Sequence, residues 1–186
     1  MTKISILAAF ASVIYLLEFN LPFFPPFYKM DLSETVVLIG GFAMGPLAAL
    51  IIELLKMIVN LLVNGTQTAF VGEIANFLIG CSFVLPACFL YARKKTQKNA
   101  ILGMALGTAS LIVIGAFLNY FVLIPAYGKI YGMEMVLSVS GKVMPAIRDV
   151  KTLILFATVP FNAIKAIACS LITALLYKRL SPLLHK

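Results

Sequence analysis

The chain has 186 residues, of which 62% are hydrophobic and only 12% carry charged side chains. Soluble globular domains have about half of their residues apolar and about a quarter charged, so this composition excludes that class and indicates an integral membrane protein. The net charge of +8 at pH 7 is then explained by membrane topology, and it gives no reason to expect nucleic acid as a partner.

Apolar segments near the length of a membrane-spanning helix follow one another along the chain. About 20 residues of α-helix cross a hydrocarbon core of roughly 30 Å. We predict a single all-α membrane domain over residues 1–186 with six transmembrane helices at 4–19, 33–44, 46–63, 69–93, 99–127 and 151–180. The second helix is too short to span an ordinary bilayer alone, so it needs a thinned or protein-covered region.

Residues 20–32 connect the first two helices and contain the sequence LPFFPPFYKMD. The prolines exclude a regular helix, and the four aromatic residues make a stiff and apolar segment. Two interpretations stay open for this connector. It is either an interfacial aromatic belt or a lid over a flat aromatic ligand.

Six crossings place both termini and the loop after the fourth helix on one side of the membrane. That side collects basic residues and no acidic ones: Lys3, Arg93, Lys94, Lys95, Lys98, Lys178, Arg179 and Lys186. Such an excess is typical of a cytoplasmic face, so we expect both termini in the cytoplasm. Five crossings would place the N-terminus on the other side. The first segment has no small-x-small cleavage site, so we expect it to be retained.

Motifs for catalysis are missing. The only histidine, His185, excludes HExxH and any histidine-based triad, and no GxSxG occurs. The stretch SGKV at 140–143 lacks the first glycine of a phosphate loop, because position 136 is valine. We therefore expect no enzyme, no ATP hydrolysis by this chain and no metal. The cysteines Cys81, Cys88 and Cys169 lack CxxC spacing and are expected to be small buried residues.

Polar residues at membrane depth are the candidate functional residues. A Lys or Asp at the centre of a membrane helix costs about 2.5–3.5 kcal/mol, and such residues usually face a bundle interior or a watery cavity. The predicted helices contain Glu53, Lys56, Glu73, Asn76, Asn119, Asn162 and Lys165.

These residues differ in how well a structural role explains them. Glu53 and Lys56 lie three apart and can pair, which favours a structural or partner-contact role. Glu73 lies near a helix N-terminus, where the dipole favours a carboxylate. Asn162 and Lys165 share a helical face. An interhelical hydrogen bond gains only about 0.6 kcal/mol, which does not offset the burial of a lysine, so we favour ligand binding there.

Several motifs in order along the chain resemble a known family. The stretches LPFFPPFYKMDLSE, IGGFAMGPLAALIIELLK, VGEIANFLIG, GAFLNYFVLIP and PFNAIK are similar to the substrate-binding S component of energy-coupling factor (ECF) vitamin transporters, in its riboflavin-specific branch. The resemblance extends from the first helix to the sixth. It implies a six-helix S-component bundle in a prokaryotic plasma membrane, in contact with membrane lipid.

The resemblance also implies a function and a set of partners. Riboflavin would be captured outside as the transported substrate, not as a cofactor, and delivered inward together with a T component and two ATPase subunits. By motif, the flavin would be bound by Asn162 and Lys165, Asn119, Glu73 and Asn76. The connector would act as a lid or gate and would contribute pocket or gate residues: Phe27, Met30, Asp31 and Leu32.

The first helix departs from the family pattern. Family members often carry Ala-x-x-x-Ala as the surface that meets the T component, whereas this chain has Ala8 and Ser12. Serine is still small enough for close helix approach, so we expect these two residues to contact that partner.

Two alternatives remain open from the sequence. A self-sufficient secondary transporter would use Glu53 or Glu73 as a proton relay, although no internal repeat of the kind common in such transporters is visible. An S component for another vitamin would have the same architecture. Thiamine is cationic and would be opposed by Lys165, whereas the sequence argues less strongly against neutral or anionic vitamins.

Overall fold

The structure is a computed structural model that describes residues 2–66 and 68–184, with side chains as far as residue 177. Lys186, which belongs to the expected basic face, lies outside these residues. The elements in chain order are α1 (Thr2–Leu16), β1 (Phe19–Asn20), β2 (Lys29–Met30), α2 (Glu34–Met44), α3 (Pro46–Asn64), α4 (Val71–Arg93), α5 (Gln97–Leu118), η1 (Asn119–Leu123), α6 (Ile124–Tyr127), η2 (Gly128–Gly132), α7 (Met133–Val143), α8 (Val150–Leu153), η3 (Ile154–Thr158) and α9 (Val159–Leu184), where η marks a π-helical turn.

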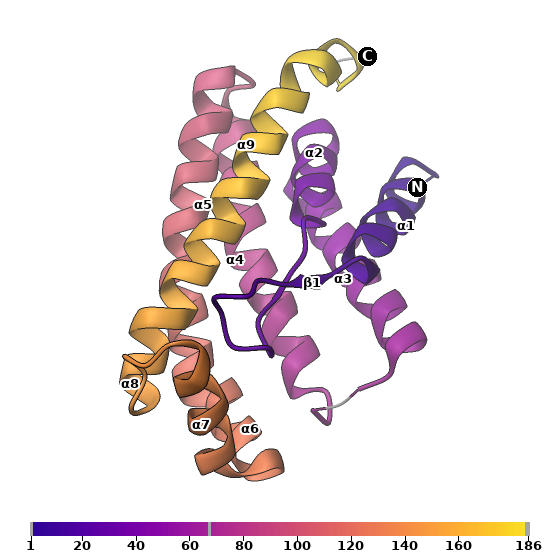
Figure 1. Ribbon diagram of the computed structural model, residues 1–186. Helices are drawn as coiled ribbons and strands as arrows, with labels where there is room; N and C mark the ends of the chain where they lie inside the picture. Colours follow the sequence, from indigo (N-terminus) through magenta and orange to yellow (C-terminus); the bar gives the residue numbers. More distant parts are fainter. Residues whose placement is uncertain (1, 67, 185–186) are drawn as a thin grey trace.

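The helices form one bundle in which α5 lies against both α4 and α9, while α1, α2 and α3 pack together beside them (Figure 1). The start of α1 and the end of α9 lie at the same end of the bundle. The exposed residues Lys3 and Arg93 to Lys95 come from the start of α1 and the end of α4.

The all-α membrane class is confirmed by the length and composition of the helices. Among the described residues, four helical segments are long and apolar enough to cross a bilayer: Pro46–Asn64, Val71–Arg93, Gln97–Val143 and Val150–Tyr177. The apolar helices α1 and α2 are shorter. Large hydrophobic side chains such as Phe10, Leu47, Phe89 and Leu171 are exposed on the outside of the bundle, as expected for surfaces that face lipid.

Glycines in α5 allow a close contact with α4. A Cβ atom added at Gly103 would lie 2.7 Å from the carbonyl oxygen of Ala87 in α4, and one at Gly107 would collide with the carbonyl oxygen of Phe83. Small residues at helix interfaces let two backbones approach, which compensates for the weak hydrophobic drive between helices in lipid. The α4 and α5 pair is therefore the rigid wall on which α9 packs.

Several boundaries differ from those predicted from the sequence, and two of the differences have a clear structural cause. Helix α1 ends at Leu16 instead of residue 19, because Phe19 pairs with Met30 and Asn20 with Lys29 in a two-stranded antiparallel hairpin. The fifth helical segment does not end at residue 127. It continues to Gly132, whose φ of 86° reverses the chain, and is followed by α7. The mixed polarity of MEMVLSVSGKV concealed this helix.

We expect Gly103→Ala to destabilise the bundle, because its methyl group must push α4 and α5 apart. Overpacking of this kind costs about 1–3 kcal/mol, which thermal unfolding in detergent, followed by circular dichroism, measures as a lower unfolding temperature. Gly141→Ala is the matched control, since its Cβ would lie 3.4 Å from the nearest neighbour, the carbonyl oxygen of Ile147. Equal unfolding temperatures for the parent and Gly103→Ala would contradict the argument.

Candidate ligand-binding site

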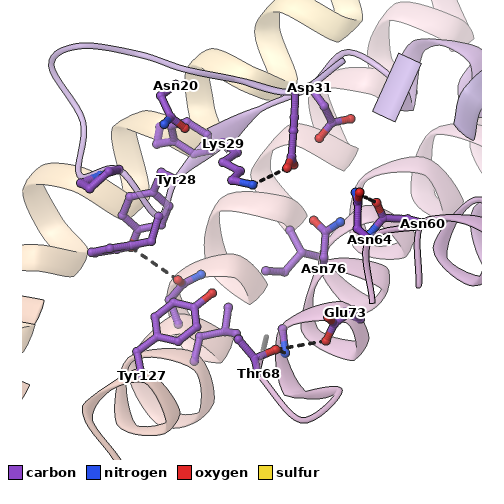
Figure 2. A pocket seen from close by; sticks show the side chains of 18 of the residues that line it. Asn20, Tyr28, Lys29, Asp31, Asn60, Asn64, Thr68, Glu73, Asn76 and Tyr127 are labelled. Atoms are coloured by element: carbon purple, nitrogen blue, oxygen red, sulfur yellow. Dashed lines mark hydrogen bonds and ion pairs between the residues drawn. The ribbon is translucent and has the colours of Figure 1, made fainter. Parts of the chain in front are cut away.

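A cavity of about 950 Å³ opens between the two halves of the bundle, away from the chain termini. Its walls come from the last turn of α1, the end of α3, the start of α4, the η1 to α7 region and α9. Residues 17–33, the capping segment, cover one side of it. Figure 2 shows Tyr28 and Tyr127 on one side of this space and Asn60 and Asn64 on the other. The volume lies within the range of about 300–1,000 Å³ that is usual for small-molecule pockets.

Aromatic contacts attach the capping segment to α9. The rings of Phe24 and Tyr28 lie 5.4 and 5.2 Å from the ring of Phe161, in edge-to-face and tilted arrangements. Tyr28 also hydrogen-bonds Thr158 and donates at 3.4 Å to Oδ1 of Asn119. Each aromatic pair of this kind contributes about 0.5–1.5 kcal/mol beyond its buried area. The segment is therefore packed onto the bundle as part of its apolar core.

A buried ion pair joins the end of the capping segment to α9. Lys165 Nζ lies 2.7 Å from Oδ2 of Asp31, while Oδ1 of Asp31 accepts hydrogen bonds from the backbone N–H and the hydroxyl group of Ser33. Burial alone would raise the pKa of Asp31, but the positive charges of Lys165 and Lys56 lower it to about 2. Asp31 is thus an ionised partner for the lysine at neutral pH.

Asn162 lines the cavity and has an amide nitrogen without a hydrogen-bond partner in the described part of the chain. Its residue is only 7% exposed, and its Nδ2 has no hydrogen-bond partner among the described residues. Gly115 makes room for this group, since a Cβ there would lie 2.5 Å from Nδ2. A buried amide without a partner costs about 1–3 kcal/mol, so an acceptor that reached Nδ2 would relieve this cost. Asn119, by contrast, already donates through Nδ2 to the carbonyl oxygen of Gly115 at 2.8 Å.

The opposite end of the cavity is polar. Glu73 Oε2 accepts a hydrogen bond from Thr68 Oγ1 at 3.1 Å. Thr68 Oγ1 itself accepts a hydrogen bond from the backbone N–H of Gly72 at 2.9 Å. Asn76 Nδ2 donates to the Tyr15 hydroxyl at 2.7 Å. On α3, Asn64 donates to Asn60 at 2.8 Å. Amides, hydroxyls and a carboxylate thus face the same space as the lysine and Asn162.

The structure brings most of the expected site residues together. The cavity is lined by seven of the nine: Phe27, Asp31, Glu73, Asn76, Asn119, Asn162 and Lys165. Met30 and Leu32 do not line it; Met30 is buried in an apolar cluster with Phe24 and Tyr28. The chain is extended here, so successive side chains point to opposite sides, and Lys29 and Asp31 take the cavity side.

Other cavity residues were missed from the sequence. They are Tyr15, Tyr28, Asn60, Asn64, Thr68, Tyr127 and Phe161, among others. Asn60 and Asn64 carried a readable signal, because two amides at i and i+4 share one face of an otherwise apolar helix. Tyr28 belongs to the connector that was considered as a lid. Tyr15, Tyr127 and Phe161 carried no such signal, since aromatic side chains in membrane helices usually pack in the core or against lipid.

The expected partner surface on α1 is not exposed. Ala8 and Ser12 are only 3% and 2% exposed, and the Ser12 hydroxyl donates to the carbonyl oxygen of Ala8 at 2.8 Å. Their face packs inward, toward the helices that contact α1, which include α2 and α3. The exposed face of α1 carries Ile6 and Phe10 instead. In this conformation the pair is inside the chain, contrary to the expectation.

Glu53, Lys56 and the three cysteines are all buried. Lys56 Nζ lies 2.8 Å from Oε1 of Glu53, so these two residues form the pair that their spacing allows. Cys81, Cys88 and Cys169 are buried free thiols. Within residues 2–66 and 68–184, no group of three or more His, Cys, Asp or Glu side chains is arranged to hold a metal ion.

Known proteins resemble the whole chain. The model of the family described as "ECF transporter, substrate-specific component" matches residues 1–177. The riboflavin transporter RibU of Staphylococcus aureus (strain TCH60) is 36% identical over 183 residues, which cover 98% of this chain and 90% of that protein. The riboflavin transporter FmnP of Bacillus subtilis (strain 168) is 31% identical over 182 residues, or 96% and 90% of the two chains.

A solved structure agrees with these sequences. The structure of the S component of a bacterial ECF transporter superposes with a TM-score of 0.76 at 34% sequence identity. The match covers all of this chain and 96% of the other.

Acid should weaken the ion pair between Asp31 and Lys165. The pKa of Asp31 is about 2 in the folded chain and ordinarily 3.8, so the stabilising contribution is complete above the ordinary value and is lost as the pH falls from about 4 to about 2. We expect the unfolding temperature of the parent to fall toward that of Lys165→Met across this window, since the variant lacks the cation. If the difference in unfolding temperature between the parent and Lys165→Met stayed the same in acid, the assignment of this ion pair would be contradicted.

Proposed function

The chain belongs to the family of ECF transporter substrate-specific components, and from this premise we propose that it binds riboflavin for uptake through the cell membrane. It is a multi-pass membrane protein and a transporter subunit, not an enzyme. The observation that carries the proposal is Asn162, a residue with an unpartnered amide nitrogen that lines the same cavity as Lys165 and several aromatic rings.

The chemistry of riboflavin suits the two ends of the cavity. Its isoalloxazine ring has an apolar dimethylbenzene edge and a pyrimidine-dione edge with carbonyl acceptors and one N–H group. Phe27, Tyr127 and Phe161 provide apolar walls, and Asn162 and Lys165 provide donors for the carbonyl groups. The ribityl chain carries hydroxyl groups, and the polar end with Glu73 and Asn76 offers acceptors and donors for them.

The capping segment is then the side of the cavity through which the ligand passes. Its contacts to α9 are the Phe24 and Tyr28 rings on Phe161 and the Asp31 pair with Lys165. We place this side outside the cell and the ends of the chain in the cytoplasm, following the excess of basic residues at the other end. Membership of the family implies release inward together with a T component and two ATPases. The absence of a Walker A motif from this sequence agrees with ATP hydrolysis by other subunits.

The partner surface involves α1 in this proposal. A contact through Ala8 and Ser12 requires α1 to separate from the helices on which it packs, because both residues are buried. The exposed apolar face with Ile6 and Phe10 is available without that movement.

Riboflavin titration tests the proposal directly. We expect the detergent-purified protein to quench riboflavin fluorescence saturably at a stoichiometry near one. Thiamine should not compete, although Lys165 opposes a cation less than its charge suggests, because Asp31 neutralises it. No quenching would overturn the riboflavin assignment. Uptake by liposomes containing this chain alone, driven by a proton gradient, would overturn the dependence on partner subunits.

Asn162→Ala should weaken riboflavin binding without harming the fold. Its Nδ2 donates to no protein group, so the substitution removes a ligand contact and breaks no protein hydrogen bond through that atom. The lost hydrogen bond predicts an increase in Kd of about 10- to 100-fold. Asn99→Ala, at the start of α5 and outside the cavity, is the control and should keep the parental Kd. Equal affinity for Asn162→Ala and the parent would remove this residue from the site.

A further inference from the structure

Five ionisable side chains form a buried cluster beside the cavity. They come from the end of the capping segment, α2, α3 and α9, and their residues are exposed by 8% or less: Asp31, Glu34, Glu53, Lys56 and Lys165. Glu34 and Glu53 are exposed by 1% and 0%, and neither lines the cavity. The ligand-binding mechanism therefore leaves two fully buried carboxyl groups without a role.

The cluster is continuous but its charges do not balance. Lys56 Nζ lies 2.9 Å from Oε1 of Glu34 and 2.8 Å from Oε1 of Glu53. Lys165 Nζ lies 2.7 Å from Asp31 and 4.0 Å from Oε1 of Glu34. Two lysines thus face three carboxyl groups, which leaves one negative charge in excess if all are ionised. The other titratable groups that face the cluster are Tyr15 from α1, Cys81 from α4 and Cys169 from α9, and none is positively charged in any form.

The excess charge falls on Glu34 and Glu53. Both oxygens of Asp31 accept hydrogen bonds, from Ser33 and from Lys165. By contrast, no hydrogen-bond donor among the described residues is directed at either oxygen of Glu53 or at Oε2 of Glu34, although Lys56 is close enough to Glu53 to form an ion pair. An uncompensated buried charge is strongly unfavourable, and a carboxyl group in that position takes up a proton instead.

The two carboxyl groups lie side by side under a glycine. A Cβ atom added at Gly80 of α4 would be 3.1 Å from Oε1 of Glu34 and would collide with Oε1 of Glu53. The absence of a side chain at position 80 lets α4 close over both groups and keeps them from solvent. Two acids this close, with one cation between them, form a site at which a single proton serves both.

We propose that Glu34 and Glu53 share one proton, which makes them a buried proton-binding site behind the ligand cavity. The proton comes from solvent before the helices close. The cluster then separates into two neutral parts, Asp31 with Lys165 and the protonated glutamate pair with Lys56. Lys165 consequently keeps a single counter-ion, and the cavity presents no net charge from this side to an uncharged ligand. The inference rests on the charge cluster and holds whatever the cavity binds.

Infrared spectroscopy tests the shared proton directly. A protonated carboxylic acid has a carbonyl stretch that a carboxylate lacks, and a maltoside detergent contributes no carbonyl absorption. We expect the parent to show this band at neutral pH, shifted in D2O. Parent protein without the band would overturn the proposal. If the parent lacked the band and unfolded at a higher temperature in sodium salt than in choline salt, the site would hold a bound cation and not a proton.

Charge balance predicts the behaviour of the variants. Glu53→Gln and Glu34→Gln each remove one negative charge, so each should lose the band. Lys56→Met removes one positive charge and should take up a second proton, with a band of about twice the parental intensity. Glu134→Gln, at an exposed position of α7, should keep the parental band. A band that survives in both glutamine variants would overturn the shared site. If the variants fail to fold, the parental spectrum alone decides.

Discussion

The ion pair between Lys165 and Asp31 is the constraint on which the arrangement of the site depends. It joins residues 134 positions apart in the sequence and is almost completely buried. A lysine at this depth is tolerated only with a partner, so the capping segment must end where its carboxylate reaches α9. Ser33 fixes that carboxylate from the other side, which makes the pair a junction between the loop, α2 and α9.

The two sides of the site differ in how firmly they are held in place. Gly103 and Gly107 place α4 and α5 in backbone contact, which gives Asn76 and Asn119 a rigid wall. The capping segment instead holds to α9 through a few aromatic rings and one ion pair. Elements held by few contacts open at lower free energy than the core does. The covering side is thus the part suited to open for a ligand, while the wall keeps its geometry.

The sequence revealed those features of the site that are local. Asn162 and Lys165 share a face because they lie three apart, and Glu53 pairs with Lys56 for the same reason. Long-range features were out of reach. Glu34 was expected at the start of a helix, and nothing near it in the chain indicates that it meets Lys56. The inward packing of Ala8 and Ser12 likewise depends on helices distant in sequence.

The π-helical turn η1 begins with Asn119, and the π-helical turn η3 ends with Thr158. Both residues contact Tyr28 of the capping segment. A π-helical turn contains one residue more than the α-helical turn that it replaces, and such turns are frequent at functional sites. The extra residue in η3 sets the rotation of everything after it in α9. If the same residues were wound as a plain α-helix, Asn162 and Lys165 would lie about 100° further around the axis relative to the preceding turns. Which residues of α9 face the cavity therefore depends on the π-helical turn before it as well as on the residue types.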